Sequence, residues 1–352
     1  MKKRVYKVSA LLFVCLVFTF SYFCIQAFKS KSVHSSENIN FDDGGKLTLL
    51  CVGFDEAGSN TDSLILTSLD IEKKELSVLQ IPRDTYYSRG TSNGKLNQLY
   101  SCSYNKTKDR FASMEALKNE IQDTFSLKID YFIAVSLDVL SSAVDKMGGI
   151  EIDLPYDLKY SDPEQNLYID LRKGNQVLDG ERSLYFVRYR AGYLDGDLGR
   201  VDAQKIFLSA FLNKLRSDIK LTTVISILKE CISDGISDIP VKTFLGLAPS
   251  VAKDAEKYQI YYMTLPGEPT RKNIDNGLSY YVVNRVGAID MLGRYFDCGF
   301  DKENFDINGV LVDTERVNFT NIYYAPNIQY NVYTDDEIKT MKINLKSKQS
   351  EK

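Results

Sequence analysis

Residues 47–81 read LTLLCVGFDEAGSNTDSLILTSLDIEKKELSVLQI and contain three apolar runs separated by short polar segments. The runs are LTLLCVGF (47–54), SLILTSLDI (63–71) and ELSVLQI (75–81), and Pro82 closes the last of them. Short apolar runs bounded by turn-forming residues indicate buried strands. The fold is therefore expected to begin with a sheet built from short apolar strands.

The chain beyond this sheet alternates between helix-like and strand-like patterns. Apolar residues recur at helical spacing in 113–124 and 201–216, whereas 131–135 and 258–264 have the character of strands. Further helices are expected at 137–147 and near 221–232, 241–252 and 280–296. Strands that alternate with helices predict an α/β fold in which helices are layered on a central mixed sheet.

The composition limits the possible chemistry. The 352 residues are 44% hydrophobic and 26% charged, which is typical of a globular protein, and the net charge of -3 gives no basic footprint for nucleic acid. The single histidine, His34, argues against a Ser-His-Asp or Cys-His site and against a histidine-ligated zinc site. Catalysis would have to use carboxylates, arginines, lysines, hydroxyls or a hard cation.

The N-terminus has the pattern of a membrane anchor. Residues 8–28 carry no charge and are long enough to span a bilayer as a helix, and basic residues are concentrated in 1–7. The positive-inside rule then places 1–7 in the cytoplasm and the rest of the chain outside the cell membrane. A cleaved secretory signal is the alternative, and it also exports the remainder of the chain.

The outer part is expected to have three sections. Residues 29–45 are polar and are interpreted as a stalk, and 46–300 as the catalytic domain. Residues 301–352 are interpreted as a partly disordered C-terminal extension, with the tail beyond about Asp335 disordered or peripheral.

Asp55 and Asp62 lie at the two ends of the loop that follows the first strand. Two carboxylates on one short loop at strand ends could hold Mg²⁺ or Mn²⁺, which bind oxygen ligands. Aspartate is also favoured in turns, so two solvated turn residues are the alternative.

A second group of polar residues follows the third strand. Arg83 and Asp84 come directly after Pro82, and Lys95 and Asn97 come from the next loop. Ligands of open α/β sheets collect at the carboxyl ends of strands, so these residues could bind or activate a substrate. An ordinary surface Arg-Asp pair is the alternative.

A third group lies in YFVRYRAGYLDGDLGRVDAQ (185–204). If FVRYR (186–190) is a strand, Arg188 and Arg190 project from one face, and Arg200 precedes the helix that carries Gln204. A helix N-terminus and arginine side chains both bind phosphate oxygens well. In the alternative, each arginine pairs with a local carboxylate, namely Asp195, Asp197 or Asp202. Taken together, the acidic pair and the cations would suit a pyrophosphate-bearing substrate.

The order of these motifs closely resembles the LytR-CpsA-Psr family. The matching segments run from about residue 47 to 216 and are VGFDEAGSNTDSLILTSLD, LSVLQIPRDTYYS, GKLNQLYS, IDYFIAVSLDVLSSAVDKMGGIEIDLP, LDGERSLYFVRYR and GDLGRVDAQ. The resemblance is weaker over 217–300.

The resemblance implies an extracytoplasmic α/β/α domain that transfers a glycopolymer from a polyprenyl-pyrophosphate carrier to a peptidoglycan hydroxyl, on N-acetylmuramic acid. It implies Asp55 and Asp62 as Mg²⁺ ligands and Arg83, Asp84 and Arg190 as catalytic residues. The pyrophosphate would lie among Arg83, Lys95, Arg188, Arg190, Arg200 and Gln204, with Asn97 and Asp197 behind them. Asp84 and Asp197 are the candidate bases. The partners would be the lipid-linked glycopolymer, peptidoglycan and membrane lipid, with no nucleic acid.

Ala203 departs from the family pattern, which often has arginine before the glutamine. One phosphate or acceptor contact would then be missing. The family's lipid tail lies in an apolar tunnel, for which the apolar faces of 133–147 and 206–215 are candidates, although such faces can also be plain core. Two other functions remain open at this point: a polyprenyl-pyrophosphate hydrolase, and a non-catalytic regulator that binds wall or lipid.

Overall fold

The computed structural model describes residues 45–54, 61–89, 92–163, 167–194, 196–217, 223, 226–227, 230, 235–240, 257–269, 280–298, 331–341, 343 and 345. The expected membrane segment, the stalk, Asp55 and Asp195 lie outside these residues. Across the described ranges, no helix combines the length and the apolar character needed to span a bilayer.

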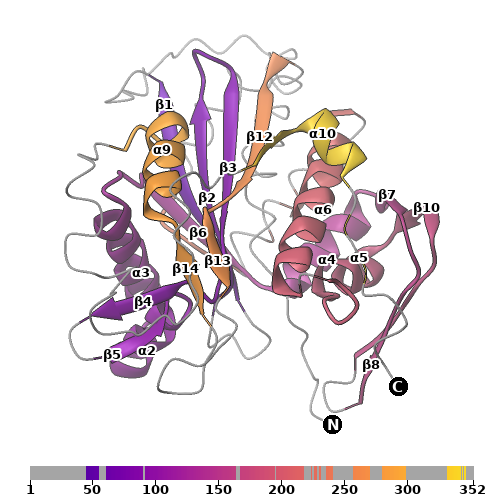
Figure 1. Cartoon of the computed structure of the whole chain (residues 1–352), viewed down its shortest axis with the longest axis horizontal. Coiled ribbons are helices and arrows are strands. Elements are labelled where there is room, and N and C mark those ends of the chain that lie inside the picture. Colours follow the sequence, from indigo (N-terminus) through magenta and orange to yellow (C-terminus); the bar gives the residue numbers. More distant parts are fainter. Residues whose placement is uncertain are drawn as a thin grey trace.

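A mixed seven-stranded sheet forms the centre of the molecule (Figure 1). Its strands, in spatial order, are β11 (Ile236–Ser237), β6 (Tyr131–Val135), β1 (Lys46–Phe54), β2 (Thr61–Asp70), β3 (Glu75–Ile81), β12 (Gln259–Thr264) and β15 (Val332–Thr334). β2 is antiparallel to both of its neighbours, β1 and β3. On their other sides, β1 is parallel to β6 and β3 is parallel to β12. The expected sheet of short apolar strands is confirmed, because almost every residue of β1, β2 and β3 is buried.

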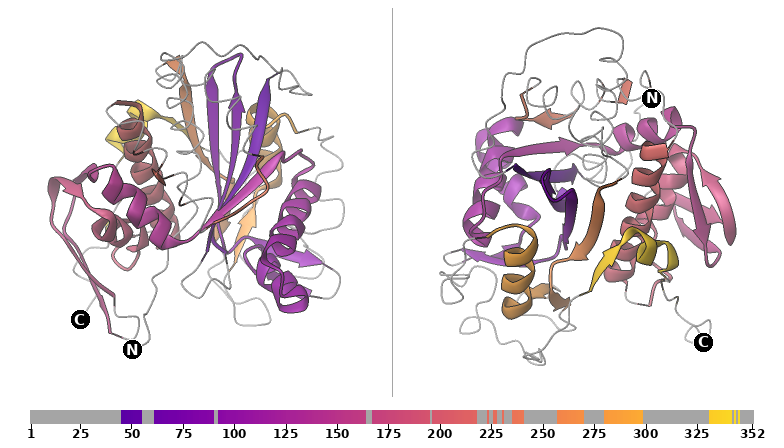
Figure 2. Two further views of the ribbon diagram at one scale, coloured as in Figure 1. Left: turned by 180° about the vertical axis from the view of Figure 1, so that it is seen from behind. Right: turned by 90° about the horizontal axis from the view of Figure 1, so that it is seen from above.

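Helices cover both faces of the sheet (Figures 1 and 2). One face packs against α2 (Gln98–Thr107), α3 (Arg110–Phe125) and α9 (Arg285–Tyr295). The other packs against α4 (Leu137–Lys146), α5 (Gly180–Arg188) and α6 (Asp197–Ser217). The predicted α/β fold with a central mixed sheet is therefore confirmed.

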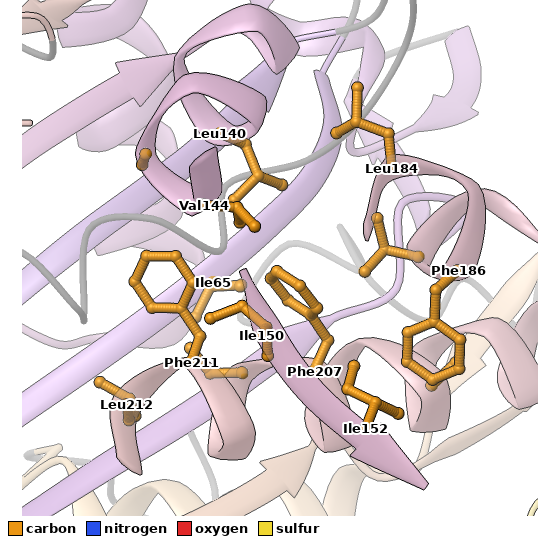
Figure 3. Close-up of a cluster of buried hydrophobic side chains, with 14 of the residues drawn as sticks. Ile65, Leu140, Val144, Ile150, Ile152, Leu184, Phe186, Phe207, Phe211 and Leu212 are labelled. Carbon is orange, nitrogen blue, oxygen red and sulfur yellow. The ribbon is translucent and has the colours of Figure 1, made fainter. Parts of the chain in front are cut away.

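Each face of the sheet carries a hydrophobic core, and one of the two lies between the sheet and helices α4, α5 and α6. Side chains from five elements point toward one another there, including Ile65 of β2, Leu140 of α4, Ile150 of β7, Phe186 of α5 and Phe207 of α6 (Figure 3). Since burying each such side chain contributes about 1.5–3 kcal/mol, this core fixes α5 and α6 against the sheet.

FVRYR (186–190) is not a strand, and the expectation that Arg188 and Arg190 share a strand face is wrong. Residues 186–188 form the end of α5, which Asp179 caps by accepting a hydrogen bond from the backbone N–H of Arg182. Leu184 and Val187, three residues apart, are buried as one helical face. Arg188 ends this helix, and Arg190 lies in the turn after it.

Several shorter strands complete the fold. β7 (Ile150–Leu154) pairs with β10 (Gly174–Leu178), and β8 (Leu158–Asp162) pairs with β9 (Leu167–Leu171). β4 (Tyr86–Arg89) forms a hairpin with β5 (Ser92–Lys95), and β13 (Gly267–Pro269) pairs with β14 (Tyr281–Val283). The helix expected near 280–296 accordingly begins later, at Arg285, because the chain first runs through β14.

The chain near the C-terminus contributes to the domain. β15 pairs with β12, and α10 (Asp335–Thr340) packs on α6 (Figure 1). Ile338 and Ile343 are buried in the same core as Phe207. The expectation of a peripheral tail beyond about Asp335 is therefore wrong for these residues, because their apolar side chains fill the space between α6 and the sheet. The boundaries of the catalytic domain, between residues 45 and 46 and between residues 300 and 301, stay predictions.

Candidate functional site

The register of β2 against β3 brings Asp62 to Arg83. Leu64 pairs with Ile81 in this antiparallel pair, so two residues further out Asp62 faces Arg83. Arg83 Nη1 donates to Asp62 Oδ1 at 2.9 Å, and both side chains are largely buried, with 21% and 17% exposed. The end of β3 thus places Arg83 beside Asp62, one of the two residues predicted to bind a divalent cation.

The β4–β5 hairpin brings Lys95 to Asp84. Tyr86 pairs with Lys95 across the hairpin, which puts Lys95 near Asp84, two positions before Tyr86. Lys95 Nζ donates to Asp84 Oδ1 at 2.9 Å and lies 5.8 Å from the centre of the Tyr280 ring. Arg83 Nε lies 4.0 Å from the same carboxylate oxygen. Asp84 therefore sits between two cations.

Arg200 lies within the first turn of α6, so the expectation that it precedes the helix is wrong. Its Nη2 is 2.8 Å from Asp197 Oδ1, and only 12% of the arginine side chain is exposed. The contact is not aligned as a hydrogen bond: Asp197 Oδ1 and Arg200 Nε are both buried with no hydrogen-bond partner among the described residues. Gly199 allows this turn to approach Tyr193 closely, since a Cβ there would lie 2.6 Å from the Tyr193 Cβ.

The cations of this region act on one another. Burial opposes the charge of Arg83, but the carboxylates of Asp62, Asp197 and Asp84 outweigh burial and raise the pKa of its guanidinium. Arg200 shows the opposite result: burial lowers the pKa of its guanidinium, and the charges of Arg83 and Arg190 add to this effect against the carboxylates. Arg200 is therefore close enough to Arg83 and Arg190 for their charges to act on it, and these three residues are called the arginine cluster.

Arg188 and Arg190 differ in their surroundings. Arg188 is half-buried at the end of α5, whereas Arg190 is exposed in the following turn. Burial and the Asp162 carboxylate raise the pKa of Tyr160, which donates to Asp162 Oδ2 at 3.2 Å, and the positive charge of Arg190 opposes this shift. Tyr160 of β8 thus lies close enough to Arg190 for the arginine charge to act on it, a proximity that the sequence did not reveal.

Gln204 and Asn97 lie behind the charged side chains. Gln204 is 4% exposed, accepts a hydrogen bond from Gln80 and donates to the carbonyl of Val187 at 3.3 Å. Asn97 Oδ1 is buried with no hydrogen-bond partner among the described residues, and the Asn97 carbonyl accepts from Thr61 at 3.1 Å. Gln80 is not among the residues predicted from the sequence, although a polar residue within an apolar strand was the available signal.

Ala203 is fully buried in the core that also contains Tyr193 and Phe207. This position is therefore occupied by a packed methyl group, and no cation projects from it.

A divalent cation could be held by the acidic residues of this cluster. Mg²⁺ usually takes one or two carboxylates, with waters and substrate phosphates as its other ligands. Asp62 provides such an oxygen donor beside Arg83, so the donor chemistry fits. Within the described ranges, no three His, Cys, Asp or Glu side chains gather closely enough to form a metal site without substrate. Asp55, the expected second ligand, lies outside those ranges.

A cavity of about 760 Å³ lies among β7, α6 and α10. Its apolar lining includes Ile152, Leu154, Phe186, Ile206, Ala210 and Ile338. Tyr193, which contacts the first turn of α6, also lines it. Of the two apolar faces considered for a lipid tail, 206–215 contributes to this cavity, whereas the apolar residues of 133–147 are packed in the cores.

This chain, an α/β domain with carboxylates at strand ends and a cluster of arginines, matches a known protein family. The model of the LytR_cpsA_psr family matches residues 18–293. The chain belongs to this family. The resemblance carried by the motifs of 47–216 is therefore confirmed.

Characterised relatives in the LytR_cpsA_psr family are named as transferases. The chain is 29% identical over 189 residues to the polyisoprenyl-teichoic acid–peptidoglycan teichoic acid transferase TagV of Bacillus subtilis, a match that covers 53% of this chain and 47% of that protein. It is 26% identical over 275 residues to TagU of Bacillus cereus, with 76% of this chain and 83% of that protein covered. The chain thus spans about half the length of the first relative and most of the second.

Solved structures of the LytR_cpsA_psr type share the fold. Protein gbs0355 of Streptococcus agalactiae superimposes with a TM-score of 0.62 at 19% identity, covering 76% of this chain and 93% of that chain. TagV of B. subtilis gives a TM-score of 0.57 at 23% identity, with 72% and 98% covered. A structure of TagT bound to LIIa-WTA gives a TM-score of 0.56 at 20% identity, with 76% and 97% covered.

Proposed function

We propose that this protein transfers a glycopolymer from a polyprenyl-pyrophosphate carrier to a hydroxyl of peptidoglycan, on N-acetylmuramic acid. The observation that carries the proposal is the cluster of Arg83, Arg190 and Arg200, in which two buried guanidinium Nε atoms have no hydrogen-bond partner among the described residues. A pyrophosphate would supply oxygen acceptors for these two Nε atoms and add negative charge beside the cations. The named activity of the TagU and TagV relatives supports the same reaction class.

In the proposed step, the acceptor hydroxyl oxygen attacks the phosphorus atom that carries the glycopolymer. The bond from that phosphorus to the bridging oxygen breaks, and polyprenyl phosphate leaves with the electron pair. Arg83 and Arg200 stabilise the charge that develops on the leaving phosphate, because fixed cations in a partly buried site need no reorganisation. Lys95 stays paired with Asp84 and adds positive charge at the edge of the cluster.

A carboxylate must accept the proton of the acceptor hydroxyl. Asp197 is better placed than Asp84, since Asp197 Oδ1 faces one cation, Arg200, at 2.8 Å, whereas Asp84 Oδ1 lies between Lys95 and Arg83. We therefore assign Asp197 as the base and Asp84 as the residue that holds Lys95 and Arg83 in place.

Mg²⁺ or Mn²⁺ is proposed as the cofactor, held by Asp62 with Asp55. When bound, the ion would neutralise charge on the diphosphate oxygens. The lipid tail is proposed to enter the cavity beside Tyr193, because this residue joins the cavity to the turn that carries Arg200. Residues 8–28 are proposed to anchor the enzyme in the cell membrane with its catalytic domain outside.

The test is a transfer assay with the full-length protein, a synthetic glycopolymer on polyprenyl pyrophosphate and peptidoglycan strands. We expect a phosphodiester-linked product, and kcat/KM at least ~100-fold lower for Arg83→Ala and Arg190→Ala, since a single electrostatic donor commonly contributes that much. Undiminished transfer in both variants would refute the assigned site. Release of phosphate product with no wall-linked polymer would show a hydrolase instead.

A further inference from the structure

The C-terminal segment, defined here as residues 331–341, 343 and 345, supplies one wall of the cavity among β7, α6 and α10. Its residues in the cavity lining are Ile338, Lys339, Met341 and Ile343. The family match spans residues 18–293, so this wall lies beyond the matched part of the chain. The walls formed by β7 and α6 lie within it.

Specific contacts hold the C-terminal segment against α6 and against the edge of the sheet (Figure 1). Asp335 accepts hydrogen bonds from Ser209 of α6 at 3.2 Å and from Tyr262 of β12 at 2.8 Å. The Nζ atom of Lys205 lies 5.1 Å from the centre of the Tyr333 ring. The segment is therefore a packed part of the domain, and its position fixes the shape of the cavity.

The C-terminal segment also reaches the turn that carries Arg200. Leu345 forms an antiparallel bridge with Tyr193, which lines the cavity. Tyr193 packs against Gly199, the residue before Arg200, where a Cβ would lie 2.6 Å from the Tyr193 Cβ. Tyr193 thus borders both the cavity and the arginine-bearing turn, so a chain attached to a diphosphate at Arg200 would enter the cavity past Tyr193.

The lining and size of the cavity suit part of a polyprenyl chain. Its buried apolar lining includes Ile152, Leu154, Leu158, Phe186, Ile338 and Ile343. Tyr156 and Val177 also line it and are 39% and 57% exposed, so the cavity opens past apolar side chains that a lipid could cover. The volume of about 760 Å³ lies within the range of pockets that enclose small-molecule ligands. The cavity therefore encloses only a part of a long tail.

We propose that the C-terminal segment is a lipid-facing wall of the donor site and determines which polyprenyl tails the enzyme accepts. The diphosphate end of the tail lies beside Tyr193, and the next isoprene units pass between α6 and Met341. This inference rests on the proposed function, in which the lipid tail enters this cavity. Tails are discriminated because only the isoprene units that fit against the wall are removed from water.

The experiment compares dimethylallyl pyrophosphate with geranylgeranyl pyrophosphate, which share the diphosphate and differ in the length of the tail. Binding to the full-length protein is measured by calorimetry in the presence of Mg²⁺. Met341→Trp adds a bulky ring at the C-terminal wall, and Ala210→Trp adds the same ring on the α6 wall. Thr340→Trp is the matched control, because Thr340 is exposed at the end of α10 and lies outside the cavity lining.

Wild type should bind geranylgeranyl pyrophosphate at least ~10-fold more tightly than dimethylallyl pyrophosphate, because the longer tail buries more apolar surface. Met341→Trp and Ala210→Trp should each reduce this ratio at least ~5-fold, since the added ring occupies space that the tail needs. Affinity for dimethylallyl pyrophosphate should stay within about twofold of wild type, because the cations remain in place. Thr340→Trp should match wild type with both ligands.

Two results would overturn the inference. If Ala210→Trp reduces the ratio while Met341→Trp behaves like Thr340→Trp, the tail occupies the cavity without using the C-terminal wall. If both cavity variants keep the wild-type ratio, the tail lies elsewhere. Failure of the proposed function looks different, because wild type would then bind neither pyrophosphate and transfer no glycopolymer. Circular dichroism and thermal unfolding verify the fold of each variant, and Met341→Phe replaces Met341→Trp if the larger ring disrupts it.

Discussion

Two partly buried ion pairs in this molecule have similar exposure and very different surroundings. Lys118 of α3 lies 2.7 Å from Asp238, with 15% and 14% of the side chains exposed. Arg200 of α6 lies 2.8 Å from Asp197, with 12% and 32% exposed.

The first pair is complete within the fold. Asp238 also accepts a hydrogen bond from the backbone N–H of Phe132, and Lys118 Nζ lies 5.4 Å from the centre of the Phe132 ring. The second pair leaves Arg200 Nε and Asp197 Oδ1 without hydrogen bonds among the described residues, and burial, together with the charges of Arg83 and Arg190, lowers the pKa of the Arg200 guanidinium. Burial of charge therefore does not mark a site by itself, whereas buried charge that the fold leaves unsatisfied does.

The largest expected effect separates the two pairs by activity. Arg200→Met should lower kcat/KM for transfer at least ~100-fold, because a charge that stabilises the leaving phosphate is lost. Lys118→Met should retain activity within about twofold, since that pair lies far from the arginine cluster in sequence and in its contacts. Equal losses in both variants would show that the distinction is wrong.

The same two variants should differ in stability in the reverse order. Lys118→Met leaves Asp238 without its cation and should lower the free energy of unfolding by about 1–3 kcal/mol. Arg200→Met also leaves a carboxylate, Asp197, without its cation, but it should lower the free energy of unfolding by less, because burial and the charges of Arg83 and Arg190 disfavour the Arg200 charge in the folded state. Urea denaturation measures both, and a larger destabilisation by Arg200→Met than by Lys118→Met would contradict the account.

A smaller effect is expected at Asp335, near the C-terminus, which accepts hydrogen bonds from hydroxyl groups of the core. Asp335 accepts hydrogen bonds from Tyr262 at 2.8 Å and from Ser209 at 3.2 Å. Asp335→Ala should lower the free energy of unfolding by about 1–2 kcal/mol, because two buried hydroxyls lose their acceptor. Asp336→Ala is the matched control, since its side chain is 92% exposed and should change stability by less than ~0.5 kcal/mol.

The smallest effect concerns pH. Hydrogen bonds from the backbone N–H and hydroxyl of Thr334 hold the pKa of Glu337 below its ordinary value of 4.5. Because the folded-state pKa is lowered, this stabilisation is complete above the unfolded-state pKa and is lost as the pH falls through the folded-state pKa. The melting temperature of wild type should exceed that of Glu337→Gln at about pH 6, and the two should converge near about pH 3. A difference that persists at low pH would show that the hydrogen bonds are not the cause.

The parts of the fold that could be predicted are those with strong apolar patterns. The strands at 47–54, 75–81 and 131–135 were recognisable because nearly every residue is buried between two helical layers. The helical structure of FVRYR (186–190) was not predictable from this segment, because five residues of mixed character fit a strand or a helix equally well. The helix cap, Asp179, lies upstream of the segment. The pairing of β15 depends on a contact with β12 that is distant in sequence and has no local signal.

The site was predictable in its residue types but not in its connections. Arg83, Asp84 and Lys95 could be placed together because Arg83 and Asp84 directly follow the third strand and Lys95 comes from the next loop along the chain. The hydrogen bonds of Gln204 could not be deduced, because its partners Gln80 and Val187 belong to other elements. Asp55 stays a prediction.

The most direct test of the central claim is calorimetric titration of the full-length protein with geranylgeranyl pyrophosphate in the presence of Mg²⁺. The account predicts binding by wild type and Lys118→Met that weakens with added salt, and at least ~10-fold weaker binding by Arg200→Met. Equal affinity in all three proteins, or no binding by wild type, would contradict the claim that the unsatisfied arginines form a diphosphate site.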